Sequence, residues 1–185
     1  MELASNHGLT SISRKEVPQV EYRLLTEEDT EQYRALRLQA LNELPANFAS
    51  SYETEKKKSI EELIKEITPS ASAFVMGAFA EAELTGIAAF KQETLEKMKH
   101  RGQILGMYIS PVMRGKGLGK KLLSSLIERI KESKTIEKID LAVAVDNHSA
   151  KALYESLGFV QFGEYTEALK LADGYVDEAY MCLEL

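Results

Sequence analysis

Two kinds of hydrophobic pattern alternate along the chain and predict a mixed α/β protein. Short apolar or alternating stretches, typical of strands, cover residues 20–25, 73–80, 84–92, 104–111, 139–145, 159–166 and 175–183. Stretches whose apolar residues return every three or four positions, typical of amphipathic helices, cover residues 26–43, 59–67, 117–130 and 147–157. A short acidic turn separates residues 73–80 from 84–92, so these two strands predict an antiparallel hairpin.

A strand, a glycine-rich turn and a helix follow one another directly in the second half of the chain. Pro111 cannot donate to a sheet ladder, so the strand over 104–111 ends there. Residues 113–121 are Met-Arg-Gly-Lys-Gly-Leu-Gly-Lys-Lys, and a helix begins near Gly117. Unpaired backbone N–H groups and the positive end of the helix dipole meet at this turn, which therefore predicts an anion site.

Charge and glycine spacing favour a phosphate site and exclude two common phosphate-binding motifs. The chain has a net charge of -6, yet positive side chains gather at the turn: Arg114, Lys116, Lys120 and Lys121. Glycines at 115, 117 and 119 permit left-handed backbone and leave room for a phosphate. A Walker loop is excluded because no Lys-Ser/Thr pair follows the last glycine, and the glycines are too closely spaced for a dinucleotide fingerprint.

A second motif follows a nearly unbroken apolar strand at residues 139–145. Residues 147–159 match the pattern Asn-x-x-Ala-x-x-Leu-Tyr-x-x-x-Gly-Phe at every fixed position. Together with Arg114-x-x-Gly117-x-Gly119, this pattern resembles the paired signatures of the GNAT N-acetyltransferase superfamily. The resemblance covers about residues 103 to 160. It implies an α/β (α+β) acyl-CoA N-acyltransferase fold, in which a mixed sheet of about seven strands is largely antiparallel, has one splayed parallel pair and is flanked by about four helices.

The same resemblance implies which residues bind acetyl-CoA. The glycine-rich loop would bind the pyrophosphate, and the backbone of the strand before it would carry the pantetheine arm as an added strand. A backbone N–H of Met107 or Ile109 would polarise the thioester carbonyl. Asn147 would either contact the coenzyme or cap the following helix. The implied cofactor-binding residues are Met107, Tyr108, Ile109, Arg114, Gly115, Lys116, Gly117, Leu118, Gly119, Lys120, Asn147 and Tyr154.

Acyl transfer from a thioester to an amine needs a neutral amine, a polarised carbonyl and a proton for the departing thiolate. Tyr154 follows Leu153 on a helix whose buried side is predicted to be Ala150, Leu153 and Leu157, so its hydroxyl should reach a cleft at the edge of the core. By resemblance Tyr154 is the catalytic acid; the alternative is a core tyrosine with a satisfied hydroxyl.

The general base stays open at this level. Residues 101–104 are Arg-Gly-Gln-Ile and lack the glutamate that some relatives place early in this strand. The alternatives are Glu93, Glu96 or His100 acting through water, a carboxylate of the Glu53 and Glu55 region, or no dedicated base.

In the loop over 45–58, Phe48 and Tyr52 either shape the acceptor pocket or pack on the sheet.

Length and composition set outer limits on class. The 185 residues, 44% hydrophobic and 28% charged, predict one folded domain over 19–185 preceded by a flexible extension over 1–18. No apolar run approaches the roughly 20 residues of a membrane span, and residues 1–19 have no export signal, so a cytoplasmic protein is expected. The single Cys182 excludes an internal disulfide. The excess of acidic residues argues against nucleic acid as a binding partner.

These observations predict an acetyl-CoA-dependent N-acetyltransferase that acts by direct transfer in a ternary complex. The expected partners are a primary amine of a small molecule or peptide and, because many relatives of the family are dimers, a second copy of the chain. No metal cofactor is expected. The alternative function is a non-catalytic module that binds or senses coenzyme A with the same fold.

Overall fold

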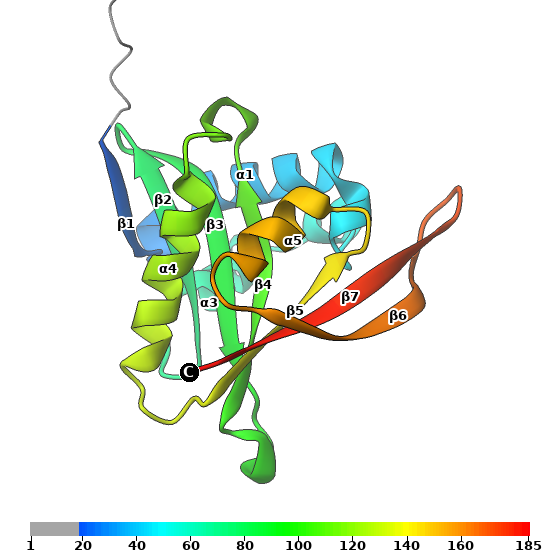
Figure 1. The fold of residues 1–185 in the computed structure, drawn as a ribbon. Helices are drawn as coiled ribbons and strands as arrows, with labels where there is room; N and C mark the ends of the chain where they lie inside the picture. Colours follow the sequence, from blue (N-terminus) through cyan, green and yellow to red (C-terminus); the bar gives the residue numbers. More distant parts are fainter. Residues whose placement is uncertain (1–18) are drawn as a thin grey trace, which may run out of the picture.

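The computed structural model describes residues 19–185, which build one seven-stranded sheet with helices on both faces (Figure 1). The strands lie in the order β1-β2-β3-β4-β5-β7-β6. All neighbours are antiparallel except β4 and β5. This arrangement confirms the mixed sheet with one parallel pair. The strands are β1 (Val20–Leu24), β2 (Ala73–Ala80), β3 (Glu83–Gln92), β4 (Arg101–Ile109), β5 (Lys138–Ala144), β6 (Val160–Lys170) and β7 (Tyr175–Glu184). The predicted extension over 1–18 lies outside the described residues.

Five α-helices within residues 19–185 cover the sheet. They are α1 (Thr30–Glu43), α2 (Tyr52–Glu55), α3 (Ile60–Ile67), α4 (Leu118–Lys131) and α5 (His148–Glu155). In Figure 1, α4 and α5 lie in front of the sheet while α1 and α3 lie behind it. The four-residue α2 falls in the stretch predicted to be a loop, where the Ser51 hydroxyl caps it by accepting from the Thr54 N–H.

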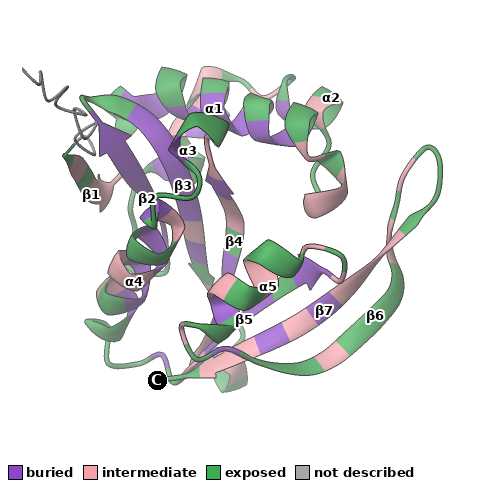
Figure 2. Cartoon of the chain, turned by 45° about the horizontal axis from the view of Figure 1, so that its top comes forward, coloured by how far each residue is buried: buried purple, intermediate pink, exposed green. Residues whose placement is uncertain are grey.

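Two hydrophobic cores lie on opposite faces of the sheet because strand side chains alternate. Phe74 and Met76 of β2 pack with the helix α4, whereas Val75 and Phe79 pack with α1 and α3. β2 is consequently buried along nearly its whole length (Figure 2). By contrast, β6 at the sheet edge is mostly exposed, and the β6–β7 hairpin is longer than predicted.

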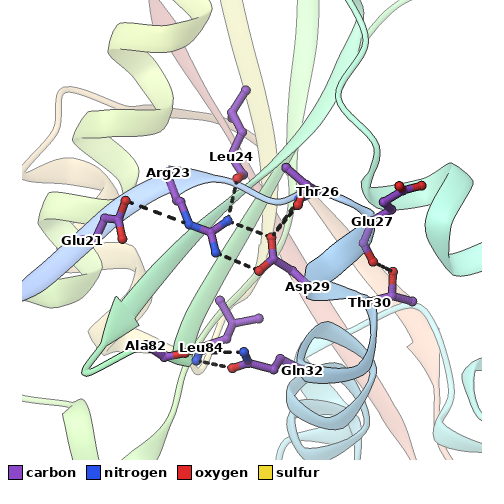
Figure 3. A network of polar contacts seen from close by, with 10 residues as sticks. All are labelled: Glu21, Arg23, Leu24, Thr26, Glu27, Asp29, Thr30, Gln32, Ala82 and Leu84. Carbon is purple, nitrogen blue, oxygen red and sulfur yellow. Dashed lines mark hydrogen bonds and ion pairs between the residues drawn. The ribbon is translucent and has the colours of Figure 1, made fainter.

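A bidentate ion pair fixes the start of the first helix (Figure 3). Arg23 of β1 donates from Nη1 and Nη2 to the Asp29 carboxylate at 2.7 and 2.8 Å. The same carboxylate accepts from the backbone N–H of Thr26 at 2.8 Å, which completes a capping box. The predicted helix over 26–43 therefore begins as a 3-10 turn, Glu27–Asp29, and continues as α1.

The parallel strands β4 and β5 pair over only three residues. The pairs are Arg101 with Lys138, Gly102 with Ile139 and Gln103 with Asp140, and the strands diverge beyond them. This finding confirms the splayed pair. Residues 104–109 of β4 consequently have no β5 partner.

A bulge in β4 accompanies this divergence. Ile87 and Ala89 of β3 face Tyr108 and Leu105, so β4 has one extra residue there. Gly106 lies in the bulge with φ +60, a left-handed conformation that favours glycine. The extra residue lets Ile104 and Met107 both face the core under α4, while Tyr108 faces the core under α1.

Candidate active site

A cavity of about 1050 Å³ passes through the sheet where β4 and β5 diverge. Its lining comes from both faces: Gly117 and Tyr154 on the side of α4 and α5, and Tyr33 and Phe48 on the side of α1. One continuous space can therefore hold two molecules that enter from opposite faces and meet at the gap in the sheet. The predicted site residues line this cavity with the exception of Lys116.

The glycine-rich loop keeps its shape through left-handed backbone. Gly115 and Gly117 have φ values of +74 and +78, and a Cβ at either position would meet no atom within 4 Å. Conformation, rather than lack of space, requires glycine at these two positions. Gly117 is the N-cap of α4, so the first N–H groups of this 14-residue helix point into the loop.

Gly119 contributes in a different way, through close packing. A Cβ there would lie 3.1 Å from Cε of Met107 and 3.2 Å from Cδ2 of Leu153. The first turn of α4 thereby approaches both β4 and α5. Any larger side chain would narrow the cavity between these three elements.

Two positive side chains of the loop, Arg114 and Lys116, already have partners within the protein. Arg114 pairs with Glu43 of α1 at 2.5 Å and donates from Nε to the Ile109 carbonyl at 2.9 Å. Lys116 donates to the Val112 carbonyl at 2.9 Å, which explains why it does not line the cavity. An anion in the loop would thus meet backbone N–H groups and, among these positive side chains, Lys120, which is exposed and lines the cavity.

Glu43 was not found from sequence, because nothing in the pattern of its helix distinguishes it from other surface acids. It accepts from the Tyr108 hydroxyl at 2.7 Å as well as pairing with Arg114. The Tyr108 hydrogen bond and the guanidinium lower the pKa of Glu43. Burial and the neighbouring carboxylate raise the pKa of Tyr108 to about 12. These contacts tie α1 to β4 and to the glycine-rich loop.

Tyr154 is the buried residue of α5, with 7% of its surface exposed. Its hydroxyl donates to the sulfur of Met107 at 3.7 Å, and burial raises its pKa to about 12. The prediction for this helix was wrong in detail: Ala150, Leu153 and Leu157 are only partly buried. All three pack against the core, and Ala150 and Leu153 also line the cavity, which leaves them partly exposed.

Asn147 caps α5, which is one of the two roles left open. Its side-chain oxygen accepts from the backbone N–H of Ala150 at 3.2 Å and from the Ser149 hydroxyl at 3.1 Å. The residue also lines the cavity. Of the two aromatic residues in the loop after α1, Phe48 both lines the cavity and packs on the sheet, while Tyr52 does not line it.

The carboxylates suggested as bases from sequence do not line the cavity. Three others do: Glu66, Asp140 and Glu178. Glu66 accepts from Tyr33 and Lys58, and Asp140 pairs with Arg101. The side chain of Glu178 makes no hydrogen bond or ion pair with any residue in 19–185, and burial raises its pKa.

Strand register places Glu178 on the opposite face from Tyr154. Glu178 of β7 pairs directly with Ala144 of β5, and directly paired residues share a face. The adjacent Val143 faces the core that contains Tyr154. Sequence could not reveal this relationship, because the register between β5 and β7 is set by tertiary pairing.

Within the described part of the chain, no group of three or more His, Cys, Asp or Glu side chains is placed to hold a metal ion. Among residues 19–185, no helix is both long and apolar enough to cross a bilayer. Burial and the neighbouring Asp140 raise the pKa of Cys182 to about 11, so its thiol stays protonated at neutral pH.

Residues 27–159 match the family model described as Acetyltransferase (GNAT) family. The spermine/spermidine N(1)-acetyltransferase of Bacillus subtilis is 32% identical over 92 residues, which are 48% of this chain and 60% of that protein. The spermidine N(1)-acetyltransferase of Vibrio cholerae is 33% identical over 78 residues, 42% of this chain and 45% of that protein. The chain thus aligns with only about half of each relative's length.

Solved structures share the fold over nearly the whole chain. A GNAT-family acetyltransferase from Streptococcus pneumoniae has a TM-score of 0.80 at 22% identity, covering 90% of this chain and 100% of that one. YncA of Salmonella typhimurium, solved with its cofactor acetyl-CoA, has a TM-score of 0.73 at 19% identity, covering 90% and 94%.

Proposed function

The chain belongs to the acetyltransferase (GNAT) family, and from that premise we propose that it moves an acetyl group from acetyl-CoA to a primary amine by direct transfer in a ternary complex. The observation that supports this most is the continuous cavity through the sheet, with the glycine-rich loop on one face and, on the other, the Glu178 carboxylate, which pairs with no residue in 19–185. Residues 19–185 would act as one catalytic domain. The acceptor would be an amine of a small molecule or a peptide.

Acetyl-CoA would bind on the face of α4 and α5. The backbone N–H groups between Arg114 and Lys120 would hold the pyrophosphate at the start of α4. The pantetheine arm would follow the unpaired edge of β4 at residues 107–109. A fold match to a structure that contains acetyl-CoA is consistent with this placement.

Backbone alternation in β4 favours particular N–H groups for the thioester carbonyl. The N–H of Ser110 donates to Thr85 of β3, so the N–H of Tyr108 also points toward β3. The carbonyl of Ile109 instead accepts from Arg114 on the open side of the strand. The N–H groups of Ile109 and Met107 accordingly face the gap and would stabilise the developing oxyanion.

Tyr154 and Glu178 would move the two protons of the reaction. Glu178 would accept a proton from the ammonium of the acceptor, whose nitrogen then attacks the carbonyl carbon and forms the C–N bond. The C–S bond breaks as Tyr154 donates its proton to the coenzyme A thiolate, and the second proton of the former ammonium would leave the new amide nitrogen and return, through water, to the Tyr154 oxygen. The two groups face opposite sides of the sheet, which matches acceptor and cofactor entering from opposite faces.

A coupled assay tests this proposal. The purified full-length chain would be incubated with acetyl-CoA and a panel of primary amines, and free thiol would be measured over time. Thiol release that requires both an amine and the protein is expected, with acetylated amine identified by mass spectrometry. Heat of acetyl-CoA binding by calorimetry without transfer to any amine would favour the alternative, a non-catalytic coenzyme A module.

A further inference from the structure

Arg37 is a buried cation in the wall of the cavity on the α1 side. Only 9% of its surface is exposed, and it lines the cavity. Its Nε and Nη1 atoms are buried and have no hydrogen-bond partner among residues 19–185. Buried N–H donors in folded proteins are nearly always satisfied, so these donors indicate a partner that is not among the described residues 19–185.

The surroundings of Arg37 do not supply that partner. The nearest carboxylate oxygen, Oε2 of Glu55, is 3.9 Å from Nε, too far for a hydrogen bond. The other oxygen of Glu55, Oε1, forms an ion pair with Nζ of Lys58 at 2.6 Å, although it too makes no hydrogen bond of regular geometry with residues 19–185. Phe48 presents its ring 5.1 Å from the guanidinium carbon, and this contact uses no N–H group.

The bulge in β4 lies next to the same guanidinium. A Cβ on Gly106 would be 3.4 Å from Nη1 of Arg37, so the guanidinium lies beside the point where the strands diverge. Glu66, which lines the cavity, is held by Tyr33 and Lys58. The described residues around Arg37 thus offer it a cavity but no hydrogen-bonding anion.

We propose that the amine acceptor also carries a carboxylate group, and that Arg37 binds this carboxylate while the amine lies at the gap between β4 and β5. The inference rests on the proposed acetyl transfer, since it concerns the acceptor of that reaction. A planar carboxylate matches the fork of N–H donors on a guanidinium. Polyamines, the substrates named for the Bacillus and Vibrio relatives, have no such group.

Matched acceptors test the proposal directly. γ-Aminobutyrate, β-alanine, leucine and a dipeptide would each be compared with the corresponding carboxamide, and spermidine and spermine would be assayed beside them. Values of kcat/KM would be corrected for the fraction of unprotonated amine. We expect the acids to exceed their amides by about 10- to 100-fold for at least one pair, the range of a charged hydrogen bond to a buried group.

Arg37→Met should abolish this preference by lowering kcat/KM for the acid to the level of its amide, and Arg37→Lys should restore part of it. Arg34→Met is the matched control. Arg34 is on the same helix, donates to the Lys56 carbonyl and does not line the cavity. This variant should therefore prefer acids over amides as strongly as the unmodified chain does. Because Arg37→Met leaves Glu55 without one of its cations, Arg37→Met/Glu55→Gln gives a second variant. Its fold is checked by thermal unfolding and by acetyl-CoA binding.

A binding experiment separates this inference from the proposed function. Butyrate and isocaproate have the carboxylate but no amine, so they should raise the melting temperature of the coenzyme A complex and should not do so in Arg37→Met. Acetyl transfer that is equal for acids and amides, or that prefers polyamines, would overturn the carboxylate site and leave the transferase intact. If no acceptor is acetylated but butyrate and isocaproate still raise the melting temperature, the proposed transferase activity is wrong and the carboxylate site at Arg37 stands.

Discussion

The hydroxyl of Tyr154 donates to the sulfur of Met107 across 3.7 Å. The bond joins α5 to β4 directly after the Gly106 bulge, at the edge that β5 leaves unpaired. A thioether is a weak acceptor, so this hydrogen bond is easily exchanged for a stronger one to a thiolate. Under the proposed function, the tyrosine proton would be available to the pantetheine sulfur.

Tyr154→Phe removes this proton donor with little change in shape. We expect kcat to fall by about 100- to 10,000-fold, the usual contribution of a positioned acid. Binding of acetyl-CoA should be retained, because the loop and the β4 backbone are untouched. Thiol release measures the first quantity and calorimetry the second.

Tyr22→Phe is the control for that substitution, since Tyr22 lies in β1, is partly buried and does not line the cavity. It should leave kcat unchanged. The pKa of Tyr154, raised to about 12 by burial, adds a further check. An acid must be protonated to act, so Tyr154 should cause no loss of activity between pH 7 and about pH 11. Full turnover in Tyr154→Phe would show that the tyrosine only fills the core.

Glu178→Gln removes the proposed base while keeping the size of the side chain. A base acts only when deprotonated, and burial raises the pKa of Glu178 above its ordinary 4.5. Activity should therefore rise with pH through that raised pKa in the unmodified chain. In the variant, this limb should disappear and kcat should fall by about 100-fold. A pH profile of kcat/KM on one acceptor measures both effects.

Glu164→Gln is the matched control for Glu178→Gln. Glu164 lies on the neighbouring strand β6 and is exposed. It pairs with Ala179, whose side chain belongs to the core that contains Tyr154, so Glu164 is on the face opposite to Glu178. Its pH profile should follow that of the unmodified chain. If Glu178→Gln kept the acidic limb, the limb would belong to the acceptor or to another group, and the assignment of the base would be wrong.

Gly117→Ala tests the backbone of the loop. Gly117 has φ +78, and alanine is strained there by roughly 1–2 kcal/mol. The loop should leave the conformation that directs its N–H groups at one point, and affinity for coenzyme A should fall about tenfold or more. Gly163→Ala is the control, because Gly163 has no left-handed φ and a Cβ there meets nothing within 4 Å. Unchanged affinity in Gly117→Ala, measured by calorimetry, would contradict a role for this backbone.

Local signals in the sequence were enough to predict most elements of the fold. The spacing of leucines after Gly117 predicted α4, and Pro111 and the glycines predicted the turn before it. The predicted strands all occur within residues 19–185, with ends that differ by a few residues. These features depend on neighbours along the chain, so a single sequence contains them.

Pairings between distant elements could not be predicted in the same way. Glu178 and Arg37 belong to a strand and a helix with ordinary patterns, and only the register of β7 and the packing of α1 bring them to the cavity. The ion pair between Glu43 and Arg114 joins a residue of α1 to a residue of the loop before α4, far apart in the sequence. Long-range contacts of this kind leave no periodic signal.

Asp29→Asn should weaken folding through the contact of β1 with α1 (Figure 3). Asp29 is 4% exposed and accepts two hydrogen bonds from the guanidinium of Arg23, which is itself partly exposed. The hydrogen bonds from Arg23 lower the pKa of Asp29 below its ordinary 3.8. A lowered pKa gives stability that is present above the ordinary value and is lost as the pH falls through the value in the folded state.

We expect the variant to lose about 2 kcal/mol in free energy of unfolding at pH 7, less than a fully buried pair would lose. The two proteins should converge as the pH falls through the lowered pKa of Asp29, because the carboxyl of the unmodified chain then becomes protonated too. Urea unfolding from pH 7 to pH 2.5 measures this difference, and a gap that stayed constant over that range would mean that the charge of Asp29 contributes nothing.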